Sequence, residues 1–110
     1  MAIISSHILD SLSGKSAAGI RCQLSRLVDD VRQPLFDVFA DTEGRINETL
    51  AVDAEDLGSE FELVMHAADY FGATDALVTC VVIRFVIDDD SRRYHMPVML
   101  APHSYSTWWS

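Results

Sequence analysis

The chain has 110 residues, 49% of them hydrophobic and 23% charged, which is the composition of one globular domain and not of a disordered segment. Its formal net charge is −9, which argues against non-specific nucleic-acid binding because such binding depends on clustered Lys and Arg. No apolar run is long enough to span a bilayer, and residues 1–6 lack the pattern of a secretory signal. We therefore expect a cytosolic protein with neither membrane nor nucleic-acid partners.

The first strand is predicted over residues 2–11, where apolar and β-branched residues are mixed with polar ones. Successive side chains of a strand point to opposite faces of the sheet. Ile4 and Ile8 therefore share one face, and Ser5 and His7 share the other. This arrangement places a histidine within an otherwise apolar strand.

Turn residues and β-rich stretches predict the elements that follow. Asp29-Asp30 begins a polar loop, Pro34 delays the next strand, and the turn at 41–44 leads tightly into another. The one convincing helix is terminated near Gly72. In chain order we expect strands at 20–27, 35–40, 45–50, 61–66, 78–87, 94–100 and 104–110, with the helix at 67–74.

Seven or eight short strands with one helix indicate an all-β sandwich of Greek-key type, in which residues 1–110 form a single domain. The acidic runs are most simply solvated turns; calcium binding there is a weaker alternative, because the spacing of a calcium loop is absent. Cys22 and Cys80 form no CxxC motif, so we expect buried free thiols and no structural zinc site. A single disulfide stays open as an alternative.

Three polar residues interrupt this apolar pattern: His7, Arg45 and His95. A single histidine in a strand is more often a packed structural residue than a catalyst, and an arginine after a turn is usually solvated. Zinc binding by His7, His66 and His95 is conceivable, but their spacing matches no zinc motif. The residues alone thus indicate an acidic β-sandwich with a few polar residues in unusual places.

Motifs along nearly the whole chain, in order, resemble the transthyretin family. His7-Ile8-Leu9-Asp10 and the following Gly-Lys-Ser-Ala-Ala-Gly-Ile look like the opening of transthyretin-related proteins, and Thr42–Ile46 is similar to their internal Gly-Arg turn. Later matches cover Phe61–Phe71, Val82–Phe85, Arg93–Pro97 and Leu100–Thr107. The resemblance implies a transthyretin-like sandwich of seven to eight strands with one short helix.

The family has a hormone-carrying branch and a branch that hydrolyses 5-hydroxyisourate. His7, Arg45 and His95 stand where the hydrolases carry their catalytic residues, so the resemblance points to the hydrolase branch. It implies urate breakdown without a metal or organic cofactor, and a homotetramer (a dimer of dimers) with clefts between subunits. The histidines would deprotonate the attacking water, and Arg45 would stabilise the oxyanion.

The C-terminus departs from the hydrolase pattern. Hydrolases typically end in Tyr-Arg-Gly-Ser, whereas this chain ends in Trp108-Trp109-Ser110. If the last strand continues to the end, Ser106, Trp108 and Ser110 share one face, opposite Thr107 and Trp109. The resemblance implies that Ser106 faces the channel, which makes Ser106, Trp108 and Ser110 the expected substrate-binding residues. The first interpretation of the changed tail is a tolerated variant that repacks an interface. Two alternatives are a divergent enzyme acting on another small heterocycle and a non-catalytic small-molecule-binding module.

Overall fold

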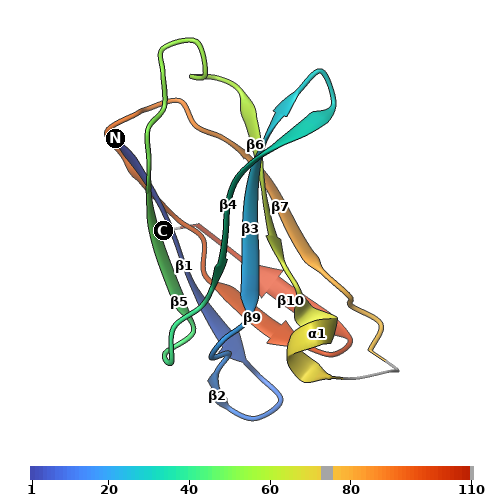
Figure 1. The fold of residues 1–110 in the computed structure, drawn as a ribbon. Helices are drawn as coiled ribbons and strands as arrows, with labels where there is room; N and C mark the ends of the chain where they lie inside the picture. The colour runs from blue at the N-terminus through green and yellow to red at the C-terminus, as the bar shows by residue number, and fades with distance from the viewer. Residues whose placement is uncertain (73–75, 110) are drawn as a thin grey trace.

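The computed structural model describes residues 1–72 and 76–109. Its strands form two sheets that pack face to face, which confirms the predicted all-β sandwich (Figure 1). The first sheet contains β1 (Ala2–Asp10), β2 (Lys15–Ser16), β5 (Arg45–Leu50), β8 (Arg93–His95), β9 (Val98–Ala101) and β10 (Ser104–Thr107). The second contains β3 (Arg21–Val28), β4 (Val31–Phe39), β6 (Glu60–Met65) and β7 (Val81–Val86), in the order β4-β3-β6-β7.

Strand β1 is the centre of the first sheet. It pairs antiparallel with β5 on one side and parallel with β8 and then β9 on the other. Its alternate residues Ala2, Ile4 and Ile8 are fully buried in the core between the sheets. The intervening residues point away from the core, as the alternation in the sequence predicts.

The observed start of β4 contradicts two predictions, namely a polar loop beginning at Asp29-Asp30 and a strand that starts only after Pro34. Asp29 and Asp30 both have positive φ and form a two-residue hairpin turn, so β4 already begins at Val31. Pro34 lies inside the strand, at the point where the β3–β4 register shifts between Leu24 and Ser25. It is tolerated there because β4 is the edge of its sheet, where a missing N–H leaves no partner unsatisfied.

Other expected elements are shorter than predicted. The helix α1 spans Ala67–Phe71 and ends at Gly72, which adopts the left-handed conformation of a C-cap; the rest of the predicted helix, 73–74, lies outside the described residues. The strand expected at 94–100 is divided into β8 and β9 at Met96-Pro97. β10 ends at Thr107, so strand alternation does not extend to Trp108.

Glu62 is buried on the outward face of the second sheet, with its side chain only 2% exposed. Arg32 Nε donates to it at 2.7 Å and Arg84 Nε at 3.0 Å. The Arg32 hydrogen bond, which outweighs the cost of burial, and the bond from Arg84 hold the pKa of Glu62 below its usual value. The carboxylate therefore joins β4, β6 and β7 across the sheet.

We expect Glu62→Gln to lower the free energy of unfolding by about 1–3 kcal/mol, because two guanidinium groups lose a charged acceptor. Glu60→Gln is the matched control: Glu60 contacts Arg84 in solvent, and exposed pairs contribute about 0–1 kcal/mol. Because folding lowers the Glu62 pKa, its contribution should be present above pH about 4.5 and disappear as the pH falls through the folded pKa. Urea unfolding at pH 7 and at low pH measures both effects, and equal losses for the two variants would contradict this role.

Cys22 and Cys80 are both free thiols; Cys22 is buried as predicted, but Cys80 is only partly buried. Burial raises the pKa of Cys22 to about 12, which makes it unreactive. Among the described residues, none of the helices is long and apolar enough to cross a membrane.

Candidate functional site

The three predicted catalytic residues, His7, Arg45 and His95, meet on the outward face of the first sheet. His7 lies directly opposite Arg45 in the β1–β5 pairing, and Ser5 lies directly opposite His95 in the β1–β8 pairing. Side chains of opposite residues and of residues two apart on a strand are neighbours on one face. Sheet register thus brings together three residues that are up to 88 positions apart (95 − 7 = 88).

His95 is held by a side chain of the central strand. Its Nδ1 lies 2.9 Å from the Oγ of Ser5, which is 97% buried (3% exposed). Burial, followed by the charges of Arg93, Arg45 and His7, lowers the pKa of His95 below its ordinary value of 6.5. His95 is therefore a neutral imidazole near pH 7, the form that can accept a proton.

Arg45 is positioned by the turn that precedes it. One Asp41 carboxylate oxygen accepts the backbone N–H groups of Glu43 and Arg45, both at 2.9 Å. Gly44, at φ 71°, donates its N–H to the Asp41 carbonyl oxygen, and its own carbonyl oxygen accepts from Ile8 N at 2.8 Å. The turn is thus fixed to the strand that carries His7. The Arg45 side chain is half-exposed, with Nε 3.7 Å from Glu43, and so is accessible to a ligand.

Three further polar residues share this face and were not predicted as site residues. Ser5 holds His95, and Asn47 lies opposite Ser5 on β5. Arg93 lies opposite Ile3, and its Nη1 donates to Asn47 Oδ1 at 3.5 Å. Two arginines on one face of a chain with net charge −9 form a local attraction for an anion. Only the register of β1 with β5 and β8 reveals this group, which is why sequence patterns missed it.

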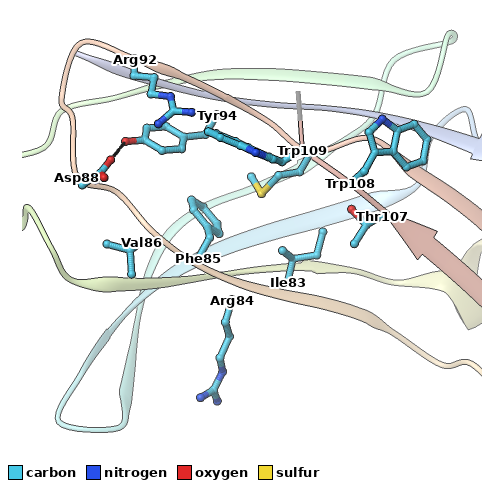
Figure 2. Close-up of a pocket in the computed structure, with 11 residues that line it drawn as sticks. Ile83, Arg84, Phe85, Val86, Asp88, Arg92, Tyr94, Thr107, Trp108 and Trp109 are labelled. Carbon is cyan, nitrogen blue, oxygen red and sulfur yellow. Dashed lines mark hydrogen bonds between the residues drawn. The ribbon is translucent and has the colours of Figure 1, made fainter.

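The C-terminal residues divide between two places. Ser106 pairs with Met99, and Met99 pairs with Leu9, so Ser106 lies on the same outward face as His7. Trp108 instead lines a groove of about 520 Å³ between β7 and the end of β10, together with Trp109 and residues 83–86 of β7 (Figure 2). Ser110 lies outside the described residues.

Trp109 is fixed against the far end of that groove. The Arg92 guanidinium lies 4.0 Å from the Trp109 ring centre and 5.1 Å from that of Tyr94, so it is stacked between two aromatic rings. Tyr94 in turn donates its hydroxyl to Asp88 at 2.9 Å, as Figure 2 shows. The expectation that Trp108 shares the strand face of Ser106 is therefore wrong, because the strand has already ended at Thr107 and both tryptophan rings line one groove.

The outward face combines a neutral, partly buried imidazole, a second imidazole and a half-exposed guanidinium. Such a group can deprotonate water and stabilise an oxyanion, which together are the requirements of acyl hydrolysis.

The model of the family described as "HIUase/Transthyretin family" matches residues 4–109. The chain belongs to this family. The resemblance inferred from the sequence motifs is confirmed.

Individual members of this family are also similar to the chain over nearly its whole length. The 5-hydroxyisourate hydrolase of Deinococcus radiodurans is 36% identical over 96% of this chain and 92% of its own length. The 5-hydroxyisourate hydrolase 2 of Rhizobium meliloti is 34% identical, with 96% and 92% covered. The solved structure of Klebsiella pneumoniae 5-hydroxyisourate hydrolase superposes with a TM-score of 0.82 at 28% identity, and covers 100% of this chain and 99% of that one.

Proposed function

We propose that this protein is a 5-hydroxyisourate hydrolase of urate breakdown. The observation that supports the proposal most strongly is the meeting of His7, Arg45 and His95 on one sheet face, in a chain whose relatives carry that name. The substrate is a small anionic heterocycle, and the arginines of this face provide the charge that such a ligand requires.

In the proposed reaction, His95 and His7 position a water molecule and remove one of its protons. The hydroxide adds to an acyl carbon of the six-membered ring, and Arg45 binds the oxyanion that forms. The carbon–nitrogen bond then breaks, and the departing nitrogen takes up the proton held by the imidazole. The net change is the addition of one water molecule, which gives 2-oxo-4-hydroxy-4-carboxy-5-ureidoimidazoline.

We further propose a homotetramer in which two subunits close each site. The supporting observation is that the catalytic group lies on an open sheet face, where one subunit alone leaves Arg45 half-exposed. A second sheet facing it would exclude water and strengthen the electrostatic interactions in the site. Symmetric pairing of identical faces is the commonest way to build such an interface.

The direct test of hydrolysis follows the absorbance of 5-hydroxyisourate that urate oxidase generates from urate in the same cuvette. We expect the protein to accelerate the decay of this absorbance at micromolar concentration or below. A folded tetramer that leaves the spontaneous rate unchanged would overturn the proposed function.

We expect Arg45→Lys to lower kcat/KM by about 10²-fold or more. Lysine keeps the charge but cannot form the planar pair of hydrogen bonds that a guanidinium offers to an oxyanion. The matched control is Arg21→Lys, because Arg21 pairs with Asp37 on the other sheet and should leave the rate unchanged. If Arg45→Lys kept full activity, the reaction would need only the positive charge of Arg45 and not its planar pair of hydrogen bonds.

In the tail, Ser106 is the proposed substrate contact on the catalytic face. Substrate contacts by Trp108, which lines the separate groove beside β7, and by Ser110 are also proposed, and the contact of Trp108 is tested directly. Saturating urate, used as an anionic heterocycle probe, should quench tryptophan emission in the parent protein and less in Trp108→Phe. Trp109→Phe is the control, because Trp109 is held by Arg92 at the other end of the groove. Absence of quenching in the parent protein, whose only tryptophans are Trp108 and Trp109, would place the tail away from the ligand.

A further inference from the structure

The outward face of the second sheet carries a second group of reactive side chains, separate from the proposed active site. A groove of about 600 Å³ crosses this face, and Cys80, Gln23, Asp37 and Arg32 are among its lining residues. Cys80 immediately precedes β7, and His66 immediately follows β6. The Sγ of Cys80 lies 3.9 Å from Nδ1 of His66. The hydrolysis proposed above uses neither residue.

A chain of hydrogen bonds fixes the orientation of His66. Arg21 donates to both oxygens of Asp37, at 2.9 and 2.6 Å, and this interaction holds the pKa of Asp37 below its usual range. The charged Asp37 can only accept, so the contact of Gln23 with it at 3.2 Å must come from the amide nitrogen. The amide oxygen of Gln23 is therefore the atom that faces His66.

The tautomer of His66 follows from this orientation. Its Nε2 lies 2.5 Å from the Gln23 oxygen and must donate a proton to it. In the neutral ring Nδ1 then carries no proton and is the acceptor that faces the Cys80 thiol. A thiol beside an imidazole whose other nitrogen is held by a third group is the arrangement that activates a cysteine nucleophile.

We propose that Cys80 and His66 form a nucleophilic thiol–imidazole pair that undergoes exchange with small disulfides bearing carboxylate groups. His66 Nδ1 takes the thiol proton, and the Cys80 sulfur attacks one sulfur of the disulfide. A new sulfur–sulfur bond forms as the old one breaks, and the departing thiolate accepts the proton from His66. The products are a mixed disulfide at Cys80 and one free small thiol.

The choice of an anionic disulfide rests on the groove's charged residues. Arg32 and Arg84 share the carboxylate of Glu62, and Arg84 also contacts Glu60, so the cluster is balanced in charge (2 − 2 = 0) and the ligand class rests on the exposed Arg32 alone. The Arg32 side chain is 59% exposed and lines the same groove as Cys80. A carboxylate of the ligand can therefore pair with Arg32 while its sulfur lies at Cys80.

The experiment treats the full-length protein with oxidised glutathione at pH 7 and follows the mixed disulfide by peptide mass. An ordinary thiol with pKa about 8.5 is only about 3% thiolate at this pH, so a base can accelerate exchange by at most about 30-fold. We expect Cys80 to react about tenfold faster than free N-acetylcysteine and Cys22 not to react in the folded protein. His66→Gln should remove this acceleration, and Gln23→Leu should reduce it, since the His66 tautomer is then no longer fixed.

The controls separate activation from folding and from charge. His103→Gln should leave the rate of exchange unchanged, and all variants should keep the parent's 5-hydroxyisourate activity. All except Arg32→Gln, which removes a partner of the buried Glu62, should also keep its urea midpoint. Arg32→Gln should slow the reaction with oxidised glutathione but not that with cystamine, which carries amines instead of carboxylates. If Cys80 reacted no faster than N-acetylcysteine, or equally fast in His66→Gln, the proposed activation of Cys80 by His66 would be wrong. If oxidised glutathione and cystamine reacted at equal rates in every variant, the proposed preference for an anionic disulfide would be wrong.

Discussion

Replacing His95 by alanine is expected to lower kcat for 5-hydroxyisourate by about 10²–10⁴-fold, the scale on which a positioned general base contributes. The neutral imidazole lies on the sheet face that carries His7 and Arg45, and the side chain of Ser5 holds its Nδ1. Alanine removes the proton acceptor but leaves the strand pairing of β8 with β1 intact. The measurement is the decay of 5-hydroxyisourate absorbance at saturating substrate, with the parent and the variant at equal subunit concentration.

Two matched variants make this result specific. His103→Ala removes an exposed histidine whose Nδ1 only accepts from the backbone N–H of Leu77, and it should leave kcat unchanged. Ser5→Ala keeps the imidazole but removes the group that holds it, so a smaller loss than in His95→Ala is expected. A loss in Ser5→Ala equal to that in His95→Ala would mean that orientation, not proton transfer, limits the rate.

The pH profile provides an independent readout of the same residue. Burial and the neighbouring cations lower the pKa of His95, so the base stays unprotonated to a lower pH than a free imidazole does. We expect the acid limb of kcat/KM to have its midpoint below 6.5 and activity to fall as the pH decreases through it. An acid limb above that value would assign the titrating group to another residue.

The sequence pattern predicted the faces of β1 correctly because buried residues recur at every second position on its core face, although Ser5 on the other face is also buried. Ile4 and Ile8 are buried, and Ser5 and His7 lie on the other face. Local patterns predicted strand ends less well. Pro34 lies inside an edge strand instead of before it, since the missing N–H faces no neighbour there.

The candidate site itself could be predicted only in part. Motifs identified His7, Arg45 and His95, but the contacts of Ser5, Asn47 and Arg93 depend on which strands are neighbours and in which register. That information is not local in sequence: β1 pairs parallel with a strand more than eighty residues later. Trp108 shows the same limit, because alternation stops where β10 ends and its side chain then lines the groove beside β7 instead of the face of Ser106.

Gly44→Ala is expected to be among the most damaging single-methyl changes in the chain. Gly44 has φ 71°, a conformation that costs an alanine about 1–2 kcal/mol. A Cβ there would also overlap the carbonyl oxygen of Ile8 and lie 3.0 Å from Ala17 N, both of which are backbone atoms that cannot rotate away. Relief requires separation of the turn from β1, which breaks the 2.8 Å bond between Ile8 N and the Gly44 carbonyl.

Gly19→Ala is the matched control, because Gly19 has nearly the same φ, 78°, and no atom within 4 Å of an added Cβ. Gly19→Ala should lose only the conformational cost, whereas Gly44→Ala should lose a further 1–3 kcal/mol or so through the broken backbone hydrogen bond. Since Arg45 directly follows Gly44, a shift of about 1 Å should also lower kcat/KM by about 10²-fold, which Gly19→Ala should not do. Urea unfolding and the hydrolysis assay, applied to both variants, measure the two effects. Equal losses of stability would show that the turn relaxes without disturbing β1. An unchanged kcat/KM in Gly44→Ala would show that the turn does not position Arg45.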